Sequence, residues 1–406
     1  MKLGAPGGPH LTYCTNIHPG ENWPEVRDNV ERYATAVKRS VAPDRPFGVG
    51  LRLSAAAADA LARRGELDAF RALLDAHGLY VFTLNGFPYG PFHGQPVKER
   101  VYLPDWLDPE RLRYTDRLAG LLAALLPDGM EGTVSTVPGA FAPRVTSHAD
   151  EARMAEMLVR HAATLHRIRE ETGKRIALAL EPEPCCHLET SVDAVGFWER
   201  HLFAPRAIRS LAAHTGMADG ASEAFLREHL GVCLDACHLA VEWEEPAAAL
   251  ERFRRAGIRV PKVQLSAGLE AAVSGPADPR LDALAAFVDP VYLHQVVERT
   301  ADGRLLRDLD LPDALARARR EPERERLWRI HFHVPLFRER LGPFANTQPW
   351  LGELIRLLRR EPVPPHLEVE TYSWDVLPER FRGEPVTDAI ARELDWVRER
   401  WEAPPG

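Results

Sequence analysis

The chain has 406 residues, 45% of them hydrophobic and 27% charged, which is ample apolar material for a large buried core and too little charge bias for general disorder. Its 51 Lys and Arg residues against 59 Asp and Glu residues give a net charge of -8, so no general field attracts nucleic acid or anionic lipid. A dedicated DNA-binding protein is therefore disfavoured, and we expect no nucleic acid among its partners.

No stretch of the sequence approaches the roughly 18 to 20 uninterrupted apolar residues that a membrane span needs, so we expect none. Residues 1–18 contain Gly, Pro and His where a signal peptide would have its apolar segment. The five cysteines lack the spacing of a secreted disulfide framework, which indicates reduced thiols. We therefore predict a cytoplasmic protein.

Apolar runs of strand length recur along the chain and alternate with stretches in which apolar residues are three or four positions apart, as in amphipathic helices. Several predicted helices end at a glycine, the usual left-handed cap. The predicted strands are Leu11–Ile17, Phe47–Leu53, Leu79–Leu84, Gly132–Val137, Ile176–Glu181, Val232–Asp235, Lys262–Ser266 and Leu367–Tyr372. This alternation predicts an α/β fold, either a closed parallel barrel or an open doubly wound sheet.

Side-chain alternation within the strands decides between these two folds. In Ile176–Glu181 the odd positions are small and then acidic, whereas the even positions are large and aliphatic, and Val232–Asp235 repeats the pattern. One strand face therefore packs on helices, and the other faces a narrow interior that becomes polar at one end. An open dinucleotide-binding sheet needs a Gly-rich first turn, and the sequence has no GxGxxG motif. We predict a TIM (β/α)8 barrel, with residues 1–406 as a single domain.

Two segments are longer than a minimal barrel requires. Residues 268–365 far exceed the roughly thirty residues of a simple βα unit and predict an insertion between the seventh and last barrel strands. Besides helices, it holds a predicted β-hairpin, Val291–Val297 with Arg304–Asp310, and an extra strand, Arg329–Val334, whose place in or outside the barrel wall stays open. The segment Gly86–Pro104, rich in Gly, Pro and aromatic residues, predicts a long loop over the barrel mouth.

Nearly every predicted strand ends in a polar residue, and the reacting groups of TIM barrels lie at these strand ends. The candidates are Asn16, His18, Arg52, Asn85, Thr136, Glu181, Glu183, Asp235, His238, Gln264 and Glu370, with His331 and His333 on the inserted strand. Several carboxylates at one mouth repel one another unless a cation neutralises them. The sequence therefore predicts a divalent metal held by Glu181, Asp235 and Glu370.

Each candidate also has a purely structural interpretation. Asp235, three residues before His238, is equally suited to cap the following helix. Glu181 would instead form an ion pair with Arg52 across the barrel. His331 and His333, roughly 6.5 to 7 Å apart on one strand face, suit a metal site or a substrate clamp but also a satisfied core. For the cysteines, filling of the core is favoured over catalysis.

At these residues the sequence resembles the xylose-isomerase-like TIM barrels, which include sugar isomerases and epimerases and endonuclease IV. Members present Glu, Asp with a nearby His, a further His and a final Glu to a divalent metal. Glu181, Asp235, His238 and Glu370 match this order. Gln264 stands where the third ligand is usually His, so the resemblance implies that the Gln264 carbonyl, or His331 or His333, completes the site.

More specifically, four segments resemble the EboE family, which is described as metabolite traffic proteins encoded in a bacterial gene cluster associated with secondary-metabolite export. They are Leu11–Glu21, Thr83–Gly90, His331–Pro335 and Glu368–Trp374. The resemblance implies a small-molecule metabolite as ligand and other proteins of that cluster as candidate partners. It names a pathway role and not a reaction, and a homo-oligomer stays open.

The leading hypothesis is an isomerase or epimerase that uses Mn²⁺, Mg²⁺ or Zn²⁺ and acts on a small polyhydroxylated or hydroxy-carbonyl metabolite. Glu181 or Glu370 would transfer the proton, helped by His238. Asn16, His18, Arg52, Asn85 and His238 would position substrate hydroxyl groups. One alternative is a non-catalytic metabolite-binding protein, which Gln264 favours; the other is a phosphodiesterase of the endonuclease IV type, against which the net charge argues.

Overall fold

The computed structural model of this protein describes residues 1–4, 7–360 and 362–404. Eight parallel strands form one sheet in the order β1-β13-β7-β6-β5-β4-β3-β2, and an isolated parallel bridge between Cys14 and Gly50 joins its two edges. The strands are β1 (His10–Tyr13), β2 (Phe47–Arg52), β3 (Leu79–Asn85), β4 (Glu131–Thr136), β5 (Arg175–Leu180), β6 (Leu230–Asp235), β7 (Lys262–Leu265) and β13 (His366–Val369). The sheet is a nearly closed TIM barrel, as the alternating pattern predicts.

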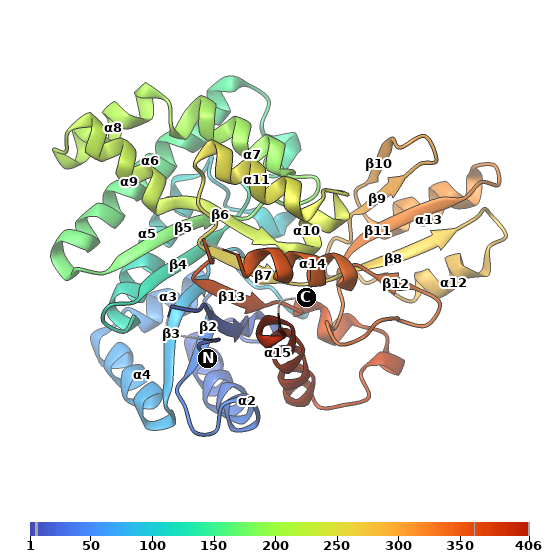
Figure 1. The fold of residues 1–406 in the computed structure, drawn as a ribbon, viewed down its shortest axis with the longest axis horizontal. Coiled ribbons are helices and arrows are strands. Elements are labelled where there is room, and N and C mark those ends of the chain that lie inside the picture. Colours follow the sequence, from blue (N-terminus) through green and yellow to red (C-terminus); the bar gives the residue numbers. More distant parts are fainter. Residues whose placement is uncertain (5–6, 361, 405–406) are drawn as a thin grey trace.

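Helices lie between and outside these strands (Figure 1). They are α1 (Trp23–Asn29), α2 (Thr35–Val41), α3 (Ala55–Leu61), α4 (Arg64–His77), α5 (Pro109–Leu125), α6 (His148–Thr172), α7 (Ser191–Phe197), α8 (Pro205–Thr215), α9 (Asp219–His229), α10 (Ala236–Val241), α11 (Pro246–Ala256), α14 (Gln348–Leu358) and α15 (Val386–Glu402). Within the described ranges, no helix combines the length and the apolar composition that a membrane crossing requires.

The strands divide their side chains between the helices and the barrel interior. In β5, Ile176, Leu178 and Leu180 belong to the main hydrophobic core, whereas the buried Ala177 and Ala179 do not. Small inward residues leave room inside the barrel for larger polar groups from other strands.

The barrel interior contains a buried ion pair beneath the mouth. The Lys262 ammonium lies 2.6 Å from a Glu368 carboxylate oxygen, and both side chains are fully buried. Burial alone lowers the pKa of Lys262, but the Glu368 carboxylate more than reverses this effect. Gly50 makes this possible, because a Cβ there would lie 1.8 Å from Glu368 Oε1. Glu368 is therefore engaged in the interior, which leaves Glu370 as the acidic residue of this strand at the mouth.

The insertion forms a second, antiparallel sheet at one side of the barrel (Figure 1). Its strands, in the order β10-β9-β11-β8-β12, are β8 (Gly268–Val273), β9 (Val296–Arg299), β10 (Leu305–Asp308), β11 (Arg326–His333) and β12 (Ala345–Asn346), with helices α12 (Pro279–Ala285) and α13 (Leu311–Arg320). A hairpin forms from β9 and β10, but β9 begins at Val296, five residues later than the predicted strand. The predicted extra strand overlaps β11 from Arg329 to His333, and β11 pairs with β8 and β9 outside the barrel wall.

The direction of β11 explains how the insertion reaches the barrel mouth. β8 begins three residues after β7 ends, so it leaves the barrel from the end of a barrel strand. β11 runs antiparallel to β8 and pairs His333 with Gly268, the first residue of β8. The end of β11 therefore returns to the mouth with His331 and His333.

The long segment Gly86–Pro104 is tied down by two buried arginines. The Arg111 guanidinium donates to the carbonyl oxygens of Gly86 and Pro104, both at 2.7 Å, and so fastens both ends of the segment. Arg52 donates to the carbonyl oxygens of Pro88 and Gly90 between them. Residues of this segment line the cavity at the barrel mouth, where the composition of the segment predicts it.

Candidate metal centre

Three carboxylates meet at the mouth of the barrel. Glu181 follows β5, Asp235 ends β6 and Glu370 follows β13, and each offers an oxygen within 4.8 Å of the others. All three side chains are buried. They come together because parallel strands have their carboxyl ends at the same edge of the barrel.

Hydrogen bonds orient two of the three carboxylates, and in each of the two a single oxygen accepts them. Glu370 Oε1 accepts from the amide nitrogens of Asn16 at 2.8 Å and Asn85 at 3.0 Å. Asp235 Oδ1 accepts from the His238 backbone N–H at 2.9 Å and from the Ser266 hydroxyl at 2.8 Å. Asp235 thus caps α10 with one oxygen, and its other oxygen is left for a ligand.

Two of the remaining oxygens of the cluster are buried without a partner in the described part of the chain. Glu181 Oε2 and Asp235 Oδ2 have no hydrogen-bond partner among the residues that the structure describes. Burial, followed by the charges of Glu370 and Asp235, raises the pKa of Glu181 well above its usual value. Burial, followed by the charges of Asp235 and Glu368, raises the pKa of Glu370 as well. Such an arrangement of oxygen donors suits a divalent cation, which would neutralise the mutual repulsion.

Gln264 lies at the level of these carboxylates. It pairs with Asp235 on one side and with Glu368 on the other. Gln264 lies two residues after Lys262 on the same strand, so both side chains point to the same face. Because the Lys262 side chain is inside the barrel, Gln264 faces the interior as well. Neither amide atom has a partner within the described part of the chain, although both are buried. Its carbonyl oxygen is therefore a neutral donor of the kind that divalent metals accept.

Three histidines adjoin the carboxylates. His333 Nδ1 lies 2.8 Å from the Glu370 carbonyl oxygen and must donate to it, so Nε2 carries a lone pair. That Nε2 is buried without a partner among the described residues, and His333 offers a ring nitrogen within 4.8 Å of ligand atoms of Asp235 and His238. Burial lowers the pKa of His333 to about 4, which keeps the ring neutral. His333 is therefore a candidate metal ligand that the insertion supplies.

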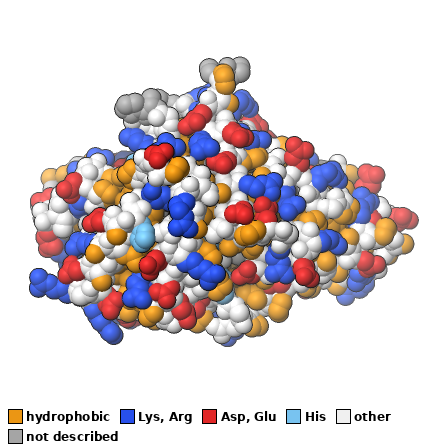
Figure 2. Space-filling model, turned by 90° about the horizontal axis from the view of Figure 1, so that it is seen from below, with side chains coloured by type: hydrophobic (Ala, Val, Ile, Leu, Met, Phe, Trp, Pro, Cys, Tyr) orange, Lys and Arg blue, Asp and Glu red, His pale blue; other side chains and the backbone are white. Residues whose placement is uncertain are grey.

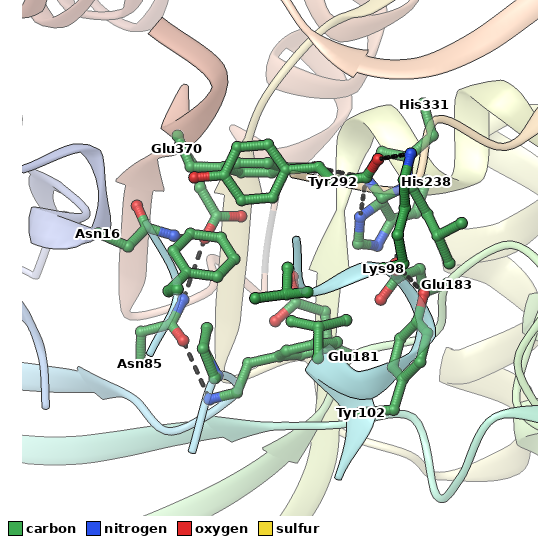
Figure 3. A pocket seen from close by; sticks show the side chains of 17 residues that line it. Asn16, Asn85, Lys98, Tyr102, Glu181, Glu183, His238, Tyr292, His331 and Glu370 are labelled. Atoms are coloured by element: carbon green, nitrogen blue, oxygen red, sulfur yellow. Dashed lines mark hydrogen bonds and ion pairs between the residues drawn. The ribbon is translucent and has the colours of Figure 1, made fainter. Parts of the chain in front are cut away.

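His238 and His331 face each other beside this group (Figure 3). Their Nε2 atoms are 3.0 Å apart, while His238 Nδ1 donates to the Pro182 carbonyl and His331 Nδ1 to the Gln295 side-chain oxygen. With both Nδ1 atoms protonated, two lone pairs would oppose each other across this gap. A proton or a cation between the rings relieves that repulsion. His331 also offers a nitrogen within 4.8 Å of Glu183, so it belongs to the outer side of the site.

The site also contains Glu183, a strand-end candidate without an assigned role in the sequence analysis, and three tyrosines that the sequence does not single out. Glu183 Oε1 accepts from the Tyr102 hydroxyl at 2.6 Å and lies against His238 and His331. Its place in the Glu-Pro-Glu-Pro segment after β5 is the signal that makes it a strand-end candidate. The tyrosines Tyr102, Tyr292 and Tyr372, which line the cavity, carry no comparable sequence signal. Cys237, expected to fill the core, also lies within 4.8 Å of His331 and His333.

Two predicted substrate contacts lie outside the cavity. Arg52 does not pair with Glu181; its guanidinium donates to Glu21 at 2.8 Å and to loop carbonyls, so it fixes the loop rather than a ligand. His18 stacks on Tyr33 with ring centroids 4.1 Å apart, and burial lowers its pKa to about 3. Asn16, Asn85 and His238, in contrast, line the cavity together with Glu181 and Glu370.

A further carboxylate supports the backbone that carries two of the candidate ligands. Glu393, on α15, accepts from the Leu336 backbone N–H at 3.0 Å and from the Thr371 hydroxyl at 2.7 Å. Leu336 follows His333 and Thr371 follows Glu370, so Glu393 links the two loops. Burial raises the pKa of Glu393 to about 7.

Replacing Glu393 by Gln is expected to change how stability depends on pH. Because the pKa is raised, the stability of the wild type relative to Glu393→Gln is greatest below about pH 4.5. It falls as pH rises through about 7. Between about pH 5 and about pH 8, the free energy of unfolding of the wild type should fall by about 2.5 kcal/mol relative to Glu393→Gln. Urea unfolding of both proteins in EDTA measures this difference, and parallel pH profiles would contradict it.

The fold and the site together define a TIM-barrel protein with a buried carboxylate and histidine centre suited to a divalent cation. No protein-family model and no curated protein matches the sequence. Among solved structures, the chain is similar to a xylose-isomerase-like TIM barrel protein from Mycobacterium smegmatis in complex with magnesium, with a TM-score of 0.51, 12% identity and 97% of this chain and 96% of the other covered. This likeness shows the fold.

Two other solved structures match with lower scores. The probable 3-DHS dehydratase AsbF from Bacillus anthracis has a TM-score of 0.44 and 11% identity over 96% of this chain and 98% of its own. The IolI protein with a bound zinc atom has a TM-score of 0.44 and 12% identity over 97% of this chain and 100% of its own.

Proposed function

We propose that this protein is a divalent-metal-dependent isomerase or epimerase that acts on a small hydroxy-carbonyl metabolite. The observation that carries the proposal is the cluster of Glu181, Asp235 and Glu370, whose buried oxygens include two without partners among the described residues. These carboxylates, with the Gln264 carbonyl or His333 Nε2, would hold the cation. The cation, when bound, supplies Lewis acidity toward a carbonyl oxygen and orients adjacent oxygens.

The side chains around the cluster supply the remaining requirements of proton transfer. Glu181 has an oxygen without a hydrogen bond to any described residue, so this oxygen is available to take a proton from carbon and to return it. Glu370 is fixed by the amides of Asn16 and Asn85 and approaches from another strand, so it is the second candidate acid or base. His238 lines the same cavity and is placed to contact a substrate hydroxyl group.

Solvent isotope exchange tests this function directly. Purified protein with Mn²⁺ and a simple hydroxy-ketone, dihydroxyacetone, is incubated in D₂O, and loss of the proton signal at the carbon next to the carbonyl is followed by NMR. We expect exchange with Mn²⁺ and none above background after EDTA treatment. The proposal fails if exchange is absent with metal or unchanged without it.

From the sequence resemblance to the EboE family, we further propose a role in a secondary-metabolite export pathway, with a metabolite of that pathway as the substrate. A non-catalytic binding protein of that pathway is the second candidate, because Gln264 replaces the usual histidine ligand. Tight metabolite binding without isotope exchange would support it.

The histidine cluster is also the kind of ligand set that a multi-metal phosphodiesterase requires. That activity on DNA needs a basic surface, whereas the net charge is -8 and the face in Figure 2 has Lys and Arg interspersed with Asp and Glu. Cleavage of abasic-site DNA by the purified protein would reverse this preference.

A further inference from the structure

The cavity above the carboxylates has two chemically different parts (Figure 3). Its floor is polar and carries the acids, His238, His331 and two amides. Its walls are apolar or aromatic and consist of Phe87, Pro88, Phe92, Val97, Val101, Tyr102, Tyr292, Leu293 and Tyr372. A compact sugar, polar on every side, would leave such walls without a matching surface.

Three rings of the wall pack on one another although they come from distant segments. The ring centroids of Phe92 and Tyr292 are 4.9 Å apart, those of Tyr292 and Tyr372 are 5.1 Å apart, and those of Phe92 and Tyr372 are 5.5 Å apart. Phe92 belongs to the loop over the mouth, Tyr292 to the insertion and Tyr372 to the segment after β13. Mutual packing of this kind holds the rings in place before a ligand arrives, which lowers the entropic cost of binding.

The charges around the cavity oppose a phosphorylated ligand. Lys98 is the one Lys or Arg among the described lining residues, and its ammonium group already contacts Asp310 at 2.6 Å and the carbonyl oxygens of Tyr292 and Asp289 at 2.7 and 3.1 Å. Glu181, Glu183 and Glu370 line the floor. A phosphate would therefore find no free cationic side chain in the described lining and several acids nearby.

We propose that the substrate is an uncharged hydroxy-carbonyl compound with a flat, apolar or aromatic body that lies against Phe92, Tyr292 and Tyr372, and that it is not a sugar phosphate. This inference rests on the proposed function, because the hydroxy-carbonyl end is assigned to the carboxylate centre. The inference adds the apolar part of the substrate, which the aromatic wall of the cavity would bind.

Three hydroxy-ketones with the same reacting end and different substituents test the proposal. They are dihydroxyacetone, its phosphate ester and 2-hydroxyacetophenone, and calorimetric titration of the Mn²⁺-loaded protein measures their affinities. We expect 2-hydroxyacetophenone to bind about tenfold more tightly than dihydroxyacetone or better, because the phenyl ring is buried on the aromatic wall. The phosphate ester should bind no more tightly than dihydroxyacetone. Equal affinities, or a preference for the phosphate ester, would overturn the proposal.

Substitution of Tyr292 locates the effect at the wall. Tyr292→Ala should weaken binding of 2-hydroxyacetophenone about fivefold or more and leave the affinity for dihydroxyacetone and the Mn²⁺ content unchanged. Tyr292→Phe, which keeps the ring, is the matched control and should bind like the wild type. If Tyr292→Ala binds the phenyl ketone as tightly as the wild type, the wall is not the recognition surface and the proposal is wrong.

The two proposals fail in different ways. If the protein binds no Mn²⁺ and catalyses no isotope exchange, but binds 2-hydroxyacetophenone through Tyr292, the proposed function fails and the ligand class stands. If metal-dependent exchange is observed and the phosphate ester is preferred, the function stands and the ligand class fails.

Discussion

Asp235→Asn is expected to lose the divalent metal that the wild type retains. The wild type should hold about one Mn²⁺ per chain after dialysis, and the affinity of the variant should fall about 100-fold or more, because a charged oxygen ligand becomes a neutral amide. The fold should persist, since the Asn oxygen can still accept the His238 and Ser266 hydrogen bonds that Asp235 Oδ1 accepts. Elemental analysis and Mn²⁺ titration, with thermal unfolding as a check on folding, measure the result.

Glu370→Gln is the companion variant, and its amide oxygen can keep the hydrogen bonds from Asn16 and Asn85. Glu242→Gln is the matched control, because Glu242 is a buried carboxylate that pairs with Arg307 outside the centre. We expect metal loss in Glu370→Gln and wild-type metal content in Glu242→Gln. Equal metal content in the wild type, Asp235→Asn and Glu370→Gln would show that the proposed ligands do not bind the metal.

Glu181→Gln should abolish most of the isotope exchange even when Mn²⁺ is saturating. A positioned general base contributes roughly 10² to 10⁴ to a rate, so we expect a loss of about 1000-fold in the exchange rate of dihydroxyacetone. The reason is that an amide cannot accept the proton, while Glu181 Oε2, unlike Glu370 Oε1, has no hydrogen bond to any described residue. Exchange measured over a range of Mn²⁺ concentrations separates this effect from weaker metal binding.

Glu183→Gln is the control for Glu181, because Glu183 lies two residues further along and accepts from Tyr102 rather than joining the carboxylate cluster. Its exchange rate should fall less than about tenfold. A Glu181→Gln variant that exchanges as fast as the wild type at saturating Mn²⁺ would remove Glu181 as the base.

Much of the barrel could be predicted from the sequence because its signals are local. Alternation of small and large side chains within one strand, as in Ile176–Glu181, reports the two faces of that strand without knowledge of its neighbours. The ends of the strands were predicted less accurately. β1 ends at Tyr13 and β13 at Val369, earlier than the predicted ends at Ile17 and Tyr372. Where a strand ends depends on how far its backbone pairs with the neighbouring strands. The side-chain pattern of one strand does not contain that information.

The meeting of the carboxylates at the barrel mouth could also be predicted from the sequence. Once the strands are parallel and consecutive, every carboxyl end lies at one mouth, so Glu181, Asp235 and Glu370 meet whatever the exact register. Arg52 shows the limit of this argument. It ends β2, one residue before the predicted end at Leu53, but its long side chain reaches Glu21 and the loop carbonyls instead of the centre.

The sequence by itself thus determined the barrel, the acidic mouth and the presence of an insertion, since each follows from periodicity and strand order. Only the tertiary structure decided that β11 returns His331 and His333 to the mouth, and that Phe92, Tyr292 and Tyr372 form one wall. The physical reason is the range of the interactions. A strand's two faces are encoded in adjacent residues, whereas the pairing of β11 with β8 and the packing of three rings depend on contacts between segments far apart in the chain.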